Sequence, residues 1–159
     1  MLIFLKKLVS PLSQQSQERI YRHVPELRHI TGSYAPKAED IQAARFYLIR
    51  QHQSSYLTHQ YRKTMENTLR LFRDDNNIWR SQGRLQHSEL KADAKSPIFI
   101  APNTKLATLI IQDAHGEYHQ GVENTISTVR LTYWRPKLRQ QTRKFIQKCV
   151  KCRRFNSLP

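Results

Sequence analysis

Two histidines and two cysteines at close spacing constrain this chain more than any other feature. His115 and His119 form a His-x3-His pair, and Cys149 and Cys152 form a Cys-x2-Cys pair after a gap of 29 residues. Two imidazoles and two thiolates complete the tetrahedral shell of a structural zinc ion and leave no open position for a catalytic water. The spacing therefore predicts one structural Zn²⁺ held by these four residues.

Each half of this pattern has another interpretation. A Cys-x2-Cys pair can be a redox motif, but that chemistry is expected near a βαβ pattern, and Cys149 ends a predicted basic amphipathic helix. A disulfide between two cysteines so close together would close no useful loop, and no secretory signal indicates an oxidising compartment. A lone His-x3-His pair can simply face solvent on a helix. Zinc binding is favoured over all three.

Three helices are expected around the metal ligands. The first starts at an N-cap, Asn103 or Thr104, and carries His115 and His119 on one face, because residues four apart on a helix share a face. The second follows a turn at Gly121, and the third follows Pro136. Their apolar stripes are Leu106, Leu109, Ile110 and Ala114; Val122, Ile126, Val129 and Tyr133; and Leu138, Thr142, Phe145, Ile146 and Cys149. A bundle of about fifty-five residues has a marginal core, so we expect folding and metal binding to be coupled.

The rest of the chain is predicted to be less regular. We expect an N-terminal segment and linker over residues 1–37, a helical arm over 38–75, a small β-rich extension over 76–103 and the zinc bundle over 104–159. The apolar run in residues 1–12 is too short for a bilayer span or a signal peptide, so it is expected to be a helical or strand fragment. Residues 13–37 are rich in Gln, Ser, Pro and Gly and are expected to be a linker or a partly ordered segment.

Inside the arm and the extension, periodicity predicts four elements. One helix begins near Ala38 and runs to Tyr56, and a second contains Tyr61, Met65, Leu69 and Phe72. Residues 74–77 read as a turn, and 78–85 and 97–100 read as short strands. The expected fold class is mainly α with a small β extension, in which a zinc-stapled three-helix bundle of helix-turn-helix type is preceded by short strands and a helical arm.

Further motifs accompany the four ligands. Next to them stand Ala114, Gln120-Gly121, Thr125, Arg130 and Tyr133-Trp134, and upstream stand residues 80–85, 96–98, 43–44, 47–49 and 51. The first set resembles the amino-terminal zinc-binding domain of retroviral and retrotransposon integrases. The second set resembles the region before that domain in Pao/BEL-type long-terminal-repeat retrotransposon polyproteins. The resemblance covers about residues 38 to 158 and is strongest from Gly83 onward.

This resemblance implies a domain that helps integrase multimers assemble on the ends of element DNA. The charge balance agrees, because 27 Lys and Arg residues against 12 acidic residues give a formal charge of +15, which favours a partner rich in phosphate. The residues expected to contact DNA phosphates are Arg139, Arg143, Lys144, Lys148, Arg153 and Arg154. The alternative is a solvated basic helix face without a partner. Base-specific contacts are not predicted.

Aromatic residues and the other histidines have simpler interpretations. Tyr133 and Trp134 could stack on nucleic acid, but their place between two amphipathic helices favours core packing. Five histidines have no partner at ligand spacing and are expected at the surface: His23, His29, His52, His59 and His87.

The chain is expected to be a non-catalytic module. Integrases join DNA through an acidic triad in the domain after the zinc bundle, and seven residues follow Cys152 here. Asp74 and Asp75 are interpreted as turn residues rather than a metal pair. Two alternatives stay open: a protein- or DNA-binding zinc module retained by a host, and the front part of a larger polynucleotidyl transferase. Expected partners are DNA and a second copy or an integrase, with no membrane and no small-molecule substrate. The expected location is intracellular, nuclear or in virus-like particles.

Overall fold

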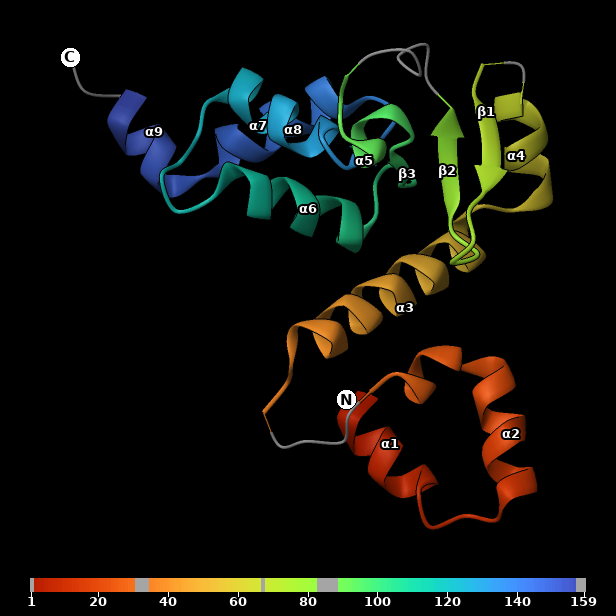
Figure 1. The fold of residues 1–159 in the computed structure, drawn as a ribbon. Coiled ribbons are helices and arrows are strands. Elements are labelled where there is room, and N and C mark those ends of the chain that lie inside the picture. Colours follow the sequence, from red (N-terminus) through yellow and green to blue (C-terminus); the bar gives the residue numbers. More distant parts are fainter. Residues whose placement is uncertain (1, 31–34, 67, 83–88, 157–159) are drawn as a thin grey trace. The chain divides into compact units, whose positions relative to one another are not determined.

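The computed structural model of the chain describes residues 2–30, 35–66, 68–82 and 89–156 (Figure 1). The chain forms two compact units, residues 1–51 and residues 52–159. None of the described helices combines the length and the hydropathy that a membrane crossing requires. Four segments are expected from the sequence, which is a finer division than these two units, and the boundaries of the four segments stay predictions.

The first unit is helical. It contains α1 (Leu2–Val9), α2 (Gln14–His23), the 3₁₀ helix η1 (Pro25–Arg28) and most of α3 (Ala38–Tyr56). Its core consists of Leu2, Val9, Leu27, Ile30 and Ala43, which are all buried. Burial of these apolar side chains, together with an ion pair between Glu26 and Arg50, holds the unit together. The prediction that residues 13–37 form a linker is wrong for α2 and η1, whereas α1 agrees with the expected helical fragment.

The second unit contains a four-stranded sheet. After α4 (His59–Glu66) come β1 (Arg70–Arg73), β2 (Trp79–Gln82), the short α5 (Ala92–Lys95) and β3 (Ile98–Phe99), and β4 (Tyr133–Trp134) follows much later. The strand order is β1-β2-β3-β4, with antiparallel pairs except for the parallel pair β3–β4. This parallel pair joins the extension to the bundle, because β3 precedes the first bundle helix and β4 lies between the second and third.

The turn between β1 and β2 follows the expected chemistry. The backbone N–H of Asn77 donates to the carbonyl oxygen of Asp74 at 2.8 Å, and the N–H of Ile78 donates to Oδ1 of Asp74 at 2.9 Å. The other carboxylate oxygen of Asp74 accepts from Nε of Arg80 at 2.6 Å. Asp74 therefore serves the hairpin, as predicted for residues 74–77.

The bundle consists of α6 (Lys105–His115), α7 (Val122–Arg130) and α8 (Leu138–Lys148), followed by α9 (Val150–Asn156). The side chain of Thr104 accepts a hydrogen bond from the N–H of Ala107, so Thr104 is the N-cap of α6. The bundle core contains Ile111, Ala114, Ile126, Val129 and Leu138. The predicted fold class, mainly α with a small β extension and a zinc-stapled bundle, is confirmed.

The end of α3 packs on the sheet through two buried polar residues. The side-chain amide of Gln53 donates to the carbonyl oxygens of Trp79 and Phe99 at 2.8 and 2.9 Å and accepts from the N–H of Trp79 at 2.8 Å. Nε2 of His52 accepts from the N–H of Ala101 at 3.1 Å. His52 is 7% exposed, so its expected surface position is wrong.

Other corrections concern the ends of elements. Leu69 and Phe72 were expected on the second arm helix, but α4 ends at Glu66 and Phe72 lies in β1. Tyr133 was expected on the α7 stripe and lies in β4 instead. Tyr133 and Trp134 do pack in apolar clusters, and the ring of Trp134 stacks on Phe99 with centroids 5.7 Å apart. The predicted strand over 78–85 is β2; residues 83–85, like His87, lie outside the described part of the chain.

Candidate metal centre

The two histidines come from the end of α6 and the loop after it. His115 is the last residue of α6 and is 3% exposed. Gly116 follows with φ of 62°, a conformation that favours glycine, and its N–H still donates to the carbonyl oxygen of Gln112 at 3.1 Å. His119 itself has φ of 51°. The expectation that both imidazoles lie on one helix face is therefore wrong: the loop, not a further helical turn, brings His119 to His115.

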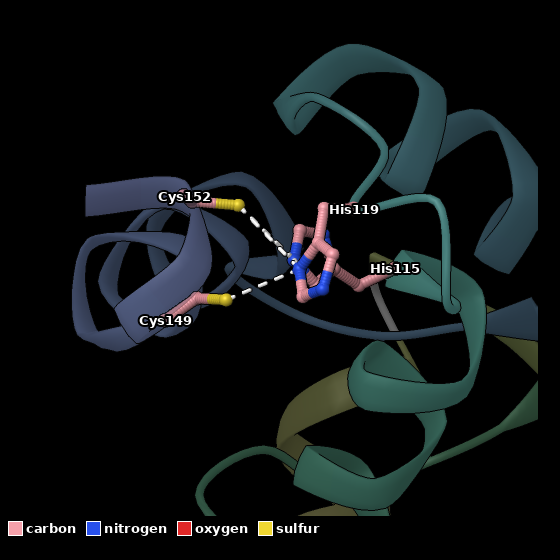
Figure 2. Close-up of side chains that lie close together, drawn as sticks. All are labelled: His115, His119, Cys149 and Cys152. Atoms are coloured by element: carbon pink, nitrogen blue, oxygen red, sulfur yellow. Dashed lines mark hydrogen bonds between the residues drawn. The ribbon is translucent and has the colours of Figure 1, made fainter. Parts of the chain in front are cut away.

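The two cysteines come from the junction of α8 and α9. Cys149 is the C-cap of α8, with extended backbone angles, and Cys152 lies in the first turn of α9. The N–H of Cys149 still donates to the carbonyl oxygen of Ile146, and the carbonyl oxygen of Cys149 accepts from the N–H of Arg153. The chain bends between these two bonds. Figure 2 shows that the bend directs both sulfur atoms toward the two imidazoles.

Four donor atoms, one from each residue, lie within 4.8 Å of one another. Nδ1 of His119 lies 3.1 Å from Nε2 of His115 and 3.2 Å from Sγ of Cys149. Sγ of Cys152 lies 3.4 Å from Nε2 of His115 and 3.7 Å from Nδ1 of His119. Zinc–nitrogen and zinc–sulfur bonds of about 2.0 and 2.3 Å in a tetrahedron place two nitrogens roughly 3.3 Å apart and a nitrogen and a sulfur roughly 3.5 Å apart. The separations match the edges of such a tetrahedron.

The surroundings of His115 fix which of its nitrogens faces the other ligands. Nδ1 lies 2.8 Å from the backbone carbonyl oxygen of Gln120, which can accept but not donate. The proton of the neutral imidazole is therefore on Nδ1, and Nε2 presents its lone pair to the group, as in many zinc sites. The hydroxyl of Thr125 donates to the same carbonyl and to that of Gly121. Phe145 packs edge-on against the imidazole, with centroids 5.7 Å apart.

The thiols differ in acidity. A hydrogen bond from the backbone of Cys152 is the largest cause that lowers the pKa of Cys149 to about 6, and contact with His115 adds to it. Burial raises the pKa of Cys152, as do its hydrogen bond to Cys149 and the negative charge there. One thiolate is therefore favoured before any metal arrives. A cation at the centre of the group would also favour the thiolate of Cys152, because metal binding stabilises thiolates.

The basic residues predicted to contact DNA lie beside this centre, on α8 and α9. All six are exposed: Arg139, Arg143, Lys144, Lys148, Arg153 and Arg154. Arg139 also forms a bidentate pair with Glu123, at 2.5 and 2.8 Å, so its charge is partly neutralised within the bundle.

Three contributions to the centre escaped sequence reasoning. The carbonyl of Gln120 has no sequence signal, because every residue carries one. Thr125 and Phe145 were recognised as a motif residue and a stripe residue, but not as neighbours of His115. Outside the centre, Arg135 is one of the 27 basic residues, yet it is 7% exposed and donates to the carbonyl oxygen of Ala107 at 3.2 Å, and burial lowers its pKa to about 10.

Comparison with known proteins gives one family match. Residues 102–158, about a third of the chain, match the family described as "Integrase zinc binding domain". Neither the curated proteins nor the solved structures gave a significant match. The matched segment contains all four ligands and the whole bundle. Residues 102–158 thus match an integrase zinc-binding domain, and their His115, His119, Cys149 and Cys152 group fits one structural zinc ion.

Proposed function

We propose that this protein is a zinc-stapled module that binds DNA through the exposed face of α8 and α9 and helps an integrase assemble on element DNA. The observation that carries this proposal is the position of the basic residues, which are exposed on the two helices joined at the cysteine ligands. The family match at residues 102–158 supports the integrase part of the proposal. The motifs upstream of the bundle favour an origin in a Pao/BEL-type retrotransposon polyprotein.

The electrostatics of the bundle support a phosphate-rich partner. No acidic residue follows Glu123 in the sequence, and Glu123 is paired with Arg139. Among the described residues, Arg143, Lys144 and Lys148 form no ion pair, so their charges can interact with a ligand or with solvent. Because neutralised phosphates release counterions, binding through these residues should weaken steeply as salt rises. We place the module with its DNA, in the nucleus or in virus-like particles, and expect self-association or association with an integrase.

We further propose that the module contributes no catalysis of its own. In the described part of the chain, the zinc-ligand group is the one cluster of three or more His, Cys, Asp or Glu side chains with donor atoms close enough for a metal. Its four protein ligands complete a tetrahedron, which is the arrangement of a structural rather than a catalytic zinc site. If this chain is the front part of a larger polynucleotidyl transferase, its contribution would be DNA contact and assembly.

Fluorescence anisotropy with a labelled DNA duplex tests the DNA proposal. Arg143→Glu/Lys144→Glu should reduce affinity, and the slope of log K against log salt should become shallower by about two. Arg19→Glu/Arg22→Glu is the matched control, because it also reverses two positive charges, on exposed residues of α2 in the other unit. Equal effects of both variants would show that net charge, not the α8 face, governs binding, and the proposal would fail.

A protein-binding module is the second candidate. Val150 and Phe155 on α9 are 72% and 79% exposed, so the basic helix also carries apolar side chains that a protein partner could cover. Replacing Phe155 with Ser should leave DNA affinity unchanged if these residues serve a protein partner. A loss of DNA affinity in that variant would favour the DNA proposal for α9 as well.

A further inference from the structure

Two arginines converge on one tryptophan at the β1–β2 hairpin. The guanidinium carbon of Arg62, on α4, lies 5.0 Å from the ring centroid of Trp79, and that of Arg73, on β1, lies 4.8 Å from it. Arg73 and Trp79 are partners in the β1–β2 ladder, so their side chains share one face of the sheet. We refer to Arg62, Arg73 and Trp79 as the arginine–tryptophan cluster.

This cluster is separate from the basic face of the bundle. The strand order places β1 at the edge of the sheet and β4, which connects to the bundle, at the opposite edge. The helix α4 packs against β1 (Figure 1). The cluster thus lies on the hairpin and helix that precede the integrase-type domain, outside the residues 102–158 that the family match covers.

The cluster holds two like charges together without a carboxylate. Among the described residues, neither Arg62 nor Arg73 forms an ion pair, and Nε of Arg62 is buried without a hydrogen-bond partner. Arg73 donates to the side-chain oxygen of Asn77 at 2.8 Å, which is a neutral partner. Each cation–π contact attracts the guanidinium to the ring, but it supplies no formal negative charge.

Such a pair is suited to an anion with planar or bidentate oxygen atoms. A guanidinium that lies over an aromatic ring can still donate from its outer N–H groups, and its fork matches the oxygens of a phosphate. Fixing two long side chains in advance also reduces the entropy lost on binding. In the sequence, Lys63 and Arg70 lie close to the two arginines, and Glu66 is the one acidic residue between His59 and Arg73. Asp74 and Asp75 follow Arg73 directly, but the carboxylate of Asp74 already accepts from the N–H of Ile78 and from Arg80.

We infer that the arginine–tryptophan cluster is a second contact surface for the phosphate backbone of DNA, independent of the α8–α9 face. A chain with two such surfaces contacts DNA with both the bundle and the β extension. The positive charge outside the bundle then has a specific role, since Arg62 and Arg73 lie where no zinc ligand and no bundle helix contributes.

The test compares pairs of substitutions in the full chain with bound zinc. Arg62→Gln/Arg73→Gln removes the guanidiniums, and Arg19→Gln/Arg22→Gln removes the same charge from α2. Binding to a labelled DNA duplex is measured by anisotropy across salt concentrations. The cluster variant should make the salt slope shallower by about two and reduce affinity on the order of fifty-fold at about 0.1 M salt, and the control should do neither.

Arg143→Gln/Lys144→Gln separates this inference from the proposed function. If the cluster variant weakens DNA binding and the α8 variant does not, the arginine–tryptophan cluster is supported and the proposed α8–α9 face is refuted. If only the α8 variant weakens DNA binding, the α8–α9 face is supported and the cluster is refuted. A folded cluster variant that binds DNA like the wild type would show that the arginines only pack the hairpin against α4, and the inference would be overturned.

A second readout covers the case in which the cluster variant does not fold. Trp134→Phe leaves Trp79 as the single tryptophan of the chain. Its fluorescence should change on addition of DNA, because a phosphate that binds the two guanidiniums alters their contact with the ring. Unchanged Trp79 fluorescence at saturating DNA would overturn the inference.

Discussion

Replacing Cys149 with Ala should unfold the bundle, because the zinc ion and the small apolar core contribute comparable free energies to its folding. In the described structure, the contacts of the thiol are with members of the ligand group and its pKa is set there, so the substitution removes a metal ligand and little packing. The bundle core has four large buried aliphatic side chains, Ile111, Ile126, Val129 and Leu138. At about 1.5–3 kcal/mol each, they contribute roughly 6–12 kcal/mol.

Structural zinc contributes a comparable amount, about 10–16 kcal/mol in small zinc domains. Small domains are stable by only about 5–15 kcal/mol in total, so removing the metal takes away about as much free energy as separates the folded from the unfolded state. Loss of the metal should therefore shift residues 104–155 to a largely unfolded state rather than weaken them slightly.

Native mass spectrometry should then show loss of the bound zinc, and far-ultraviolet circular dichroism should show loss of helix. Chelation of the wild-type protein should give the same spectrum. His59→Ala is the control, because His59 is an exposed histidine outside the ligand group. If zinc is absent from the Cys149 variant but its helix content and amide dispersion in NMR spectra equal those of the wild type, the staple argument is refuted.

Three further outcomes follow from single contacts. Gln53→Leu removes three hydrogen bonds to backbone groups, of which the bond to Phe99 is buried and the two to Trp79 are partly buried. It should lower the free energy of unfolding by about 2–5 kcal/mol in urea titrations; a change below about 1 kcal/mol would mean that water replaces the amide. Thr104→Ala removes the N-cap of α6 and should cost about 0.5–2 kcal/mol in the same assay, whereas Thr104→Ser should restore most of it. Burial, and then the charge of Arg135, lower the pKa of His52 in the folded protein. As the pH falls, His52 therefore takes up a proton in the unfolded chain before it does so in the folded one. The free energy of unfolding should fall as the pH drops below about 6.5 and level off below the folded-state pKa. His52→Gln keeps an acceptor for the N–H of Ala101 and should remove this part of the pH dependence, and parallel pH curves for both proteins would contradict the assignment.

The bundle helices could be predicted because local signals agree with tertiary packing there. Thr104, Gly121 and Pro136 mark the starts of α6, α7 and α8, and apolar residues recur at helical spacing between them. In residues 13–37 the local signals are weak: α2 is rich in Gln and Arg and buries no residue completely, so its composition resembles that of a linker. Phe72 matched the period of α4, but pairing with β2 placed it in a strand.

The ligands could be predicted from spacing, but their geometry could not. A separation of four residues fits a helix face, and yet the helix ends at His115 because Gly116 takes a positive φ. His119 also has a positive φ, which is uncommon for a residue with a side chain. Such a conformation is stabilised by contacts of the folded site and leaves no trace in residue spacing. The hydrogen bond from His115 to the carbonyl of Gln120 is hidden for the same reason.

The position of the ligands links metal binding to the proposed DNA contacts. All four lie at helix ends or in the loop, where the regular backbone hydrogen bonds of α6 and α8 stop. Arg153 and Arg154 follow Cys152 directly on α9, so the metal also sets the direction in which this helix leaves α8. Chelation should therefore lower DNA affinity more than Arg153→Gln/Arg154→Gln does in the zinc-bound protein, because it unfolds the bundle, α8 and α9 included, whereas the substitution removes two charges. Equal losses in an anisotropy titration would show that these two charges account for the whole contribution of the metal site to DNA binding.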